Sequence, residues 1–294
     1  MLSLLQNDLP LDALKRKWAP APSQFMPLMG MDVHYRDEGV RDDPFPIVLI
    51  HGTSASLHTW AGWVSFFKAT RRVITVDIPG FGLTGPDPKA DYTSTHYAEF
   101  VLALLDKLKV DRFVIGGNSL GGEVAWHVGV KAPERIKAMV LVDSAGIKAE
   151  TGFPIGFTLA AIPQLTWLTT RSTPKVLVAA SVHFVYGDKA RIQPGVIDRY
   201  YDLLLRPGNR LALGQRLQEH RKGCDTSLLS RLTMPVMILW GAKDRLFGLD
   251  HAKDWHEALP GSRLVVLDEC GHIPHEEDPA LSAAAVQQFL HDVR

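Results

Sequence analysis

The 294-residue sequence contains little cysteine and has no excess of charge of either sign. Cys224 and Cys270 are its two cysteines, too few for a disulfide framework and typical of a reducing compartment. Lysine plus arginine and aspartate plus glutamate each number 32, so the formal net charge is zero. A neutral chain offers no general attraction for a phosphate backbone, and we therefore expect no nucleic-acid partner.

Long hydrophobic runs are also missing from the sequence. No stretch of 18 apolar residues occurs, which predicts that no segment spans a membrane. Residues 1–18 lack the basic start and the long apolar stretch of a signal peptide, so we expect a cytoplasmic protein. Within them, residues 11–18 (LDALKRKW) are expected to form an exposed turn or two of amphipathic helix. Hydrophobic residues make up 46% of the chain, enough to exclude disorder.

A regular alternation of apolar and helical segments is what the sequence does contain. Short runs rich in valine and isoleucine predict strands buried on both faces, and they lie at 46–52, 72–80, 112–118, 138–146, 234–241 and 263–272. Segments with helical periodicity lie between or after them, at 97–110, 122–136 and 280–293. This alternation predicts a parallel α/β sheet, and the alternating polarity of residues 25–39 predicts an antiparallel hairpin before it.

Residues 147–230 break this rhythm. They carry helix-like patterns with Pro and Gly interruptions and no clear strand. A helical block inserted between two strands is typical of a cap over the edge where α/β sheets bind their ligands. The block holds 11 basic and 6 acidic side chains, a net charge of +5, against −5 for the rest of the chain. The opposite charges could hold the block on the rest of the chain, or the basic block could attract anionic substrates. The alternative is that these charges are solvated at the surface and have no role.

The most specific chemical signal is the sequence Gly117-Asn118-Ser119-Leu120-Gly121, which follows a predicted strand and precedes a predicted helix. A nucleophilic serine on such a tight turn projects its Oγ from the sheet edge, and small residues two places away on each side let the chain turn sharply. The helix start supplies the N–H of Leu120 to an oxyanion. The competing interpretation is a Gly-rich turn without chemistry.

Two further candidate catalytic residues lie at strand ends on the same predicted edge. His272 would take the serine proton and return it to the leaving group, and Asp244 would hold the imidazole tautomer. Asp143, which ends another strand, is a second candidate for the acid. Asp77 and His275 are weaker candidates, and we expect His275 to lie at the surface or to fix a loop.

Two loops that follow predicted strands, at residues 51–54 and 80–85, carry further candidate residues. The N–H of Thr53 is the candidate for the second oxyanion donor, and His51 is expected to fix this loop through hydrogen bonds. Residues 80–85 match G-x-G-x-x-G, but Pro86 follows at once and leaves no helix start for a pyrophosphate, so we interpret them as a loop. The pair His272-x-x-His275 alone is weak evidence for a metal site. We therefore expect no metal and no cofactor.

Taken in order, the segments HGTSASLHTW, DIPGFGLTG, GNSLGG, WGAKD and GHIPHEEDP resemble the successive signatures of the α/β-hydrolase superfamily. The resemblance covers almost the whole chain, with residues 147–230 the exception. It implies an α/β fold with a mostly parallel eight-stranded sheet, a core of residues 1–146 and 231–294, and an inserted helical cap at 147–230. It also implies a catalytic triad of Ser119, His272 and Asp244, which acts through an acyl-enzyme without a cofactor.

Within this superfamily the serine selects a class of reaction. Haloalkane dehalogenases and epoxide hydrolases use a carboxylate nucleophile, whereas a serine suits acyl transfer. The prediction is a carboxylesterase acting on a small or medium apolar or aromatic substrate. The elbow is also similar to that of the meta-cleavage-product hydrolases, which split C–C bonds, although that family usually has Trp after the histidine and this chain has Ile273. A non-catalytic ligand-binding scaffold is the alternative from a different class.

The expected partner is a small molecule bound near the triad. Aromatic residues of the inserted block would supply apolar surface to such a pocket. The candidate pocket residues on the body are Ser54, Trp60, Phe81, Asn118 and Ile273.

Overall fold

The structure, a computed structural model, describes residues 7–147, 152–220 and 224–293. Eight strands in these ranges form one sheet in the order β1-β2-β4-β3-β5-β6-β7-β8. They are β1 (Gln24–Leu28), β2 (Met31–Gly39), β3 (Ile47–Ile50), β4 (Arg72–Val76), β5 (Phe113–Asn118), β6 (Ile136–Val142), β7 (Val236–Gly241) and β8 (Arg263–Leu267). β2 pairs antiparallel with both β1 and β4, and the other neighbours pair parallel. The predicted sheet with an antiparallel start is confirmed.

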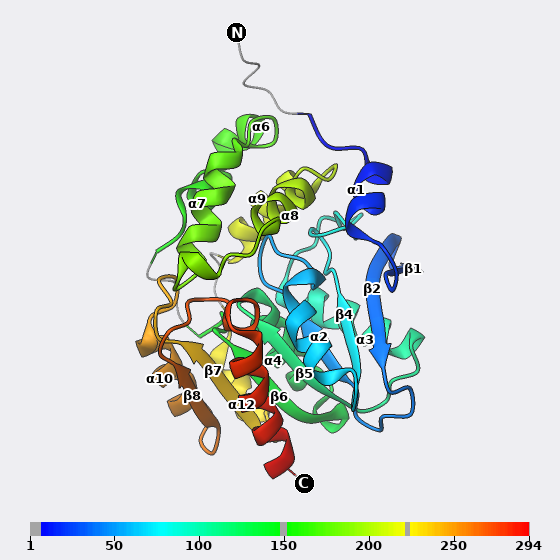
Figure 1. Cartoon of the computed structure of the whole chain (residues 1–294), viewed down its shortest axis with the longest axis vertical. Coiled ribbons are helices and arrows are strands. Elements are labelled where there is room, and N and C mark those ends of the chain that lie inside the picture. The colour runs from blue at the N-terminus through cyan, green and yellow to red at the C-terminus, as the bar shows by residue number, and fades with distance from the viewer. Residues whose placement is uncertain (1–6, 148–151, 221–223, 294) are drawn as a thin grey trace.

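Helices follow most of the strands and cover both faces of the sheet (Figure 1). The helices outside the β6–β7 connection are α1 (Leu11–Trp18), α2 (Ala61–Phe67), α3 (Ser94–Lys107), α4 (Leu120–Lys131), α10 (Leu249–Ala258), α11 (Pro274–Glu277) and α12 (Pro279–Asp292). Short 3₁₀ turns lie at Leu57–Trp60, Pro133–Arg135, Pro163–Leu165, Lys189–Arg191 and Thr226–Arg231.

The described residues of the connection between β6 and β7 form five α-helices, which we call the helical insertion. They are α5 (Ile155–Ala160), α6 (Thr166–Thr169), α7 (Lys175–Val185), α8 (Val196–Leu204) and α9 (Asn209–His220). In Figure 1 the insertion lies over one edge of the sheet, with α6 at the end farthest from the strands. The helical character predicted for this part of the chain is therefore seen in the residues described.

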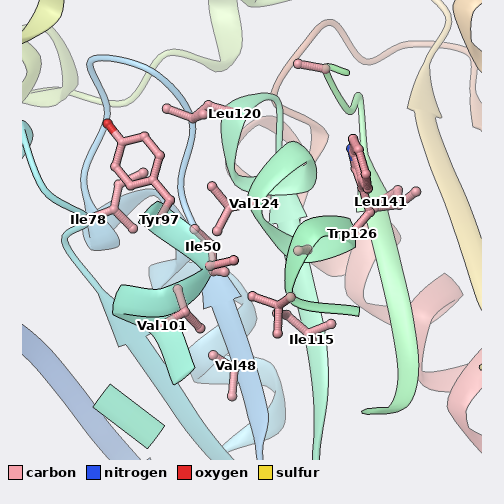
Figure 2. Packing of buried hydrophobic residues seen from close by; sticks show 14 of the residues in the cluster. Val48, Ile50, Ile78, Tyr97, Val101, Ile115, Leu120, Val124, Trp126 and Leu141 are labelled. Atoms are coloured by element: carbon pink, nitrogen blue, oxygen red, sulfur yellow. The ribbon is translucent and has the colours of Figure 1, made fainter. Parts of the chain in front are cut away.

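Alternate side chains of the buried strands enter two apolar layers, one on each face of the sheet. Val48 and Ile50 of β3 pack with α3 and α4, whereas Ile47 and Leu49 pack with α2 and α12. Figure 2 shows the first layer, in which Val124 and its neighbours on α4 lie against the strands. Because β3 and β5 are neighbouring parallel strands, the loops at their carboxyl ends emerge side by side at one edge of the sheet.

The predicted N-terminal helix forms as α1, but it is not simply exposed. Leu14 is buried against Leu83 and Leu203, so α1 packs on α8 of the helical insertion. Its partners come from distant parts of the chain, and the amphipathic pattern alone does not reveal them. Among the helices of the described residues, none combines the length and the hydropathy needed to cross a bilayer.

Residues 80–85 form the loop that the sequence predicts directly after β4. Phe81 and Gly85 close it as an isolated antiparallel bridge, and the next helix does not begin until Ser94. Gly82 has a φ of 52°, and a Cβ there would lie 2.1 Å from the carboxyl carbon of Asp77. The glycine is therefore required by the fold of this turn.

Candidate active site

Ser119 stands on a sharp turn between β5 and α4. Its φ of 55° and ψ of −118° are unusual for a residue with a side chain. A Cβ on Gly117 would lie 2.0 Å from the carbonyl oxygen of Gly121, and a Cβ on Gly121 would lie 2.0 Å from that of Ile50. Both flanking glycines are thus dictated by backbone contacts, and helix α4 begins at the next residue, Leu120.

His272 and Asp244 form a buried hydrogen-bonded pair. The ring Nδ1 of His272 lies 2.8 Å from Oδ2 of Asp244. The other carboxylate oxygen, Oδ1, accepts hydrogen bonds from the N–H groups of Leu246 at 2.7 Å and Phe247 at 3.1 Å. These contacts fix the carboxylate and through it the imidazole. Ser119 and His272 line the same cavity.

The loop that carries His272 is held from two sides. The side-chain amide of Asn118 donates to the carbonyl oxygen of His272 at 2.8 Å and to that of Val142 at 3.1 Å. The backbone N–H of His272 donates to the carbonyl oxygen of Val185, the last residue of α7, at 2.8 Å. The helical insertion therefore touches the residue that pairs with Asp244.

Glu277 joins the same loop to the insertion, and sequence reasoning missed it. Its Oε2 accepts from the N–H groups of Gly271 at 2.8 Å and Gly187 at 2.9 Å, and its Oε1 accepts from Asp188 N–H at 2.7 Å. The two backbones pass so closely that a Cβ on Gly187 would lie 2.6 Å from the nitrogen of Gly271. Backbone-to-carboxylate contacts of this kind leave no pattern in the sequence.

Asp143, the second candidate for the acid, lies beside the His272–Asp244 pair. One oxygen of Asp143, one oxygen of Asp244 and one ring nitrogen of His272 lie within 4.8 Å of one another. Asp143 has a φ of 42° and accepts a hydrogen bond from the N–H of Gly241 at 2.9 Å. Burial and the neighbouring Asp244 carboxylate raise the pKa of Asp143 well above its usual range, which favours the protonated form of Asp143.

The loop after β3 is held by His51, as expected. The backbone N–H of Ile78 donates to Nε2 of His51 at 3.1 Å, and the protonated Nδ1 donates to the carbonyl oxygen of Gly52 at 2.8 Å. Burial lowers the pKa of His51, which keeps the ring neutral in this tautomer. Thr53 and Leu120, the two candidate oxyanion donors, both line the cavity. As the first residue of α4, Leu120 has no helical acceptor for its N–H.

Asp77 supports two loops and stands apart from the His272–Asp244 pair. It accepts hydrogen bonds from Nδ1 of His34, from Leu57 N–H and from Leu83 N–H, each at 2.7 Å. Burial alone would raise the pKa of Asp77, but His34, with help from His51 and His58, holds it well below its usual range. Asp77 is therefore a fixed anion that ties together the loops after β3 and β4.

A cavity of about 290 Å³ opens in front of Ser119, between the sheet edge and the helical insertion. Apolar side chains of the insertion, including Phe157 and Leu177, make up much of its wall. One part of the wall is charged, where Arg216 donates to Glu123 at 2.9 Å and both side chains are buried. The cavity thus suits an apolar molecule with the reactive group at Ser119.

The predicted pocket residues divide into two groups. Ser54, Asn118 and Ile273 line the cavity. Trp60 and Phe81 lie in the apolar layers of the core and are absent from the cavity wall. Both aromatic rings are fully covered because they fill space beneath the loops, where large apolar side chains stabilise the fold most.

His275 is buried and is not a surface residue. Its ring centroid lies 4.0 Å from that of Trp60 at an interplanar angle of 31°. Burial lowers the pKa of His275 well below its usual range, so the ring packs as a neutral aromatic group. The polar segment around it suggests exposure, but the side chain turns inward against Trp60.

This fold, with a serine on the turn after β5 and a buried His–Asp pair on neighbouring loops, defines a class of hydrolase. Residues 46–279 match the family described as alpha/beta hydrolase fold, and the chain belongs to this family. The predicted α/β-hydrolase fold is thus confirmed.

Several known proteins are similar along most of their length. An uncharacterised protein of Mycobacterium tuberculosis is 31% identical, and the match covers 94% of this chain and 83% of that protein. A 2-hydroxymuconate semialdehyde hydrolase of Pseudomonas sp. (strain CF600) is 26% identical over 89% of this chain and 91% of its own. The solved structure of a putative lipase from Acinetobacter baumannii AYE superposes with a TM-score of 0.80 at 22% identity, covering 98% of each chain.

Proposed function

We propose that this chain is a serine hydrolase that cleaves a carboxylic ester of a small or medium apolar or aromatic substrate. One observation carries the proposal: the strained turn places Ser119 in the wall of an apolar cavity that His272 also lines. The hydrogen bond from His272 Nδ1 to Asp244 supports the roles of base and orienting acid. The helical insertion, within residues 147–230, would act as the cap over a core of residues 1–146 and 231–294.

The reaction follows from these positions. Nε2 of His272 takes the proton of Ser119 as Oγ attacks the ester carbon, and Asp244 stabilises the imidazolium that forms. The N–H groups of Thr53 and Leu120 stabilise the oxyanion. The histidine then returns the proton to the leaving alcohol, and water hydrolyses the acyl-enzyme by the same steps in reverse order.

Cleavage of a C–C bond beside a ketone is the second candidate. The similarity to a 2-hydroxymuconate semialdehyde hydrolase favours it. The Ile273 side chain beside His272, in the cavity wall where the meta-cleavage-product hydrolases usually have Trp, favours the ester.

A panel of substrates tests the proposal. Purified protein would be assayed with short and long acyl esters, an aryl ester and a dienoate C–C substrate, each also with Ser119→Ala as the control. Ester turnover that depends on Ser119 is the expected result. Preference for the dienoate with weak ester turnover would favour the second candidate. An equally negligible rate of both proteins on every substrate would instead support a non-catalytic binding scaffold.

A further inference from the structure

The far end of the helical insertion exposes large apolar side chains. Trp167 is 61% exposed, Leu168 is 40% exposed, and Val176 is 70% exposed. They lie on α6 and at the start of α7, at the end of the insertion that is farthest from the sheet (Figure 1). We call these three residues, together with Arg171 and Lys175, the tip. Soluble surfaces rarely gather exposed apolar side chains of this size without a partner.

The charged residues of the tip itself, Arg171 and Lys175, are both basic. Residues 152–187 contain no aspartate or glutamate, whereas Arg171 and Lys175 are both exposed. Lys175 forms an ion pair with Asp198 on α8, an exposed pair that contributes little in water. An apolar surface flanked by basic side chains is complementary to the headgroup region of an anionic lipid layer. Tryptophan is the side chain that such an interface favours most.

Three threonine hydroxyl groups beside the tip already donate hydrogen bonds to backbone carbonyl oxygens. The hydroxyl groups of Thr169 and Thr173 donate to the carbonyl oxygens of Leu165, at 3.2 Å, and Thr169, at 3.0 Å. The hydroxyl group of Thr170 donates to Thr166 O at 2.7 Å. Removing water from these three hydroxyl groups leaves no donor without an acceptor, so the apolar side chains of the tip can enter an apolar layer while Arg171 and Lys175 keep their charges at the headgroups.

The cavity of the candidate site reaches the same end of the insertion. Leu168, Pro174 and Leu177 belong to the wall that also includes Ser119. Leu168 is therefore both a wall residue and part of the exposed tip. A hydrocarbon chain that left a lipid layer at the tip would meet apolar wall on its way to Ser119.

We propose that the tip docks on an anionic lipid surface and that the cavity takes the acyl chain of an ester from that surface. The lipid surface fits better than a second copy of this chain, because a symmetric dimer through the tip would bring the same basic residues together. The part of the proposal that concerns the substrate rests on the hydrolase activity proposed above, whereas docking stands on the tip alone.

Binding to vesicles tests the docking. The full chain is mixed with phosphatidylcholine vesicles with and without phosphatidylglycerol, at low and high salt, and the bound fraction is measured by flotation. Val176→Glu should weaken binding to the anionic vesicles by roughly tenfold or more, because it places a negative charge in the contact. The matched control is Leu281→Glu, which changes a 51% exposed leucine in the first turn of α12.

The outcomes separate the alternatives. Wild-type protein and Leu281→Glu should both bind the anionic vesicles, and salt should weaken that binding. Absence of wild-type binding, or equal loss in the two variants, would overturn the proposal. So would a solution dimer that Val176→Glu dissociates, since a second copy would then cover the tip.

Two esters keep docking apart from catalysis. Hydrolysis of a short, water-soluble ester should be the same in wild-type protein, Val176→Glu and Leu281→Glu. Hydrolysis of a long-chain ester held in anionic vesicles should fall in Val176→Glu by the same factor as the binding. Failure of wild-type protein to cleave the soluble ester would remove the proposed function and leave the vesicle-binding result standing. Equal long-chain rates in the two variants would remove the substrate part alone.

Discussion

Arg216 provides a sharp test of how the helical insertion is held on the body. Its Nη2 donates to Oε2 of Glu123 at 2.9 Å, and the two side chains are 3% and 1% exposed. Arg216 belongs to α9 of the insertion, and Glu123 to α4, one turn beyond Ser119. Burial alone would raise the pKa of Glu123, but Arg216, with help from His220 and Ser94, holds it well below its usual range.

The expected cost of Arg216→Met follows from burial. The substitution leaves the Glu123 carboxylate buried without its main counter-charge, which costs about 3–5 kcal/mol in comparable buried pairs. The unfolding entropy of a chain of this size is about 0.6 kcal/mol/K, so Tm should fall by about 5–8 °C. Adding Glu123→Gln to this variant should recover most of the loss, because no uncompensated charge remains.

A surface pair provides the matched control for this experiment. Arg263 and Asp292 are also 2.9 Å apart, but their side chains are 44% and 49% exposed. Arg263→Met should therefore change stability by about 1 kcal/mol or less. Thermal unfolding followed by circular dichroism measures all four proteins. Equal Tm changes for Arg216→Met and Arg263→Met would refute the argument from burial, and a double variant as unstable as Arg216→Met would refute the buried charge as the cause.

The Arg216–Glu123 pair also makes the folding stability depend on pH. The folded-state pKa of Glu123 is below that of the unfolded chain, so its carboxylate contributes stability that is fully present above about pH 4.5 and lost as the pH falls. In Arg216→Met the burial effect dominates and raises the pKa, so this variant gains relative stability when Glu123 is protonated. The Tm difference between wild type and variant should shrink on acidification from pH 8 to pH 5. A constant difference would contradict this.

Three further predictions concern the candidate triad and the turn that carries it. Ser119→Ala should lower kcat on an ester substrate by a factor of about 10⁶ while thermal unfolding stays cooperative; an active Ser119→Ala would reject the nucleophile. Gly121→Ala should cost about 1–3 kcal/mol in chemical denaturation and lower turnover, because its Cβ meets backbone at 2.0 Å. Gly248→Ala, whose Cβ meets nothing within 4 Å, should leave turnover unchanged and cost less than about 1 kcal/mol, the loss of a glycine N-cap of α10. Asp244→Asn should lower kcat by about 10⁴ because the tautomer of the histidine is lost. Asp143→Asn should lower kcat by less than about tenfold, because the raised pKa of Asp143 favours a neutral acid that a neutral amide resembles; the reverse ranking in steady-state kinetics would assign the acid to Asp143, after β6.

The turn around Ser119 could be predicted because it depends on local sterics. Gly117 and Gly121 face backbone atoms at 2.0 Å, and any chain that makes this turn must meet the same constraint within five residues. The end of β7 could also be located, because an apolar run buried on both faces is visible in composition. β8 shows the apolar run as well, although it is an edge strand in which Arg263 and Val266 are exposed. Local patterns therefore located the serine, the histidine and both candidate acids.

The supports of the site could not be predicted, because they join distant segments through groups without a signature. The Glu277 carboxylate accepts a hydrogen bond from the N–H of Gly187, 90 residues earlier in the chain. Val185 supports His272 only through its backbone carbonyl oxygen, which accepts a hydrogen bond from the N–H of His272. The sequence also does not reveal on which side of a loop an aromatic ring packs. For this reason Trp60 is predicted in the cavity wall, whereas it lies in the core. Such contacts depend on the packing of whole elements.

Helix α7 connects the proposed lipid-docking tip to the loop that carries His272. It begins in the tip at Lys175 and ends at Val185, whose carbonyl oxygen accepts a hydrogen bond from the N–H of His272. Its 11 residues span about 16 Å, and a hydrogen-bonded helix of this length transmits a displacement along its axis with little compression. Docking of the tip would therefore reach the His272 loop through a single rigid element. The rate on a soluble ester, with and without anionic vesicles, measures this coupling, and an unchanged rate with bound vesicles would mean that docking only delivers substrate.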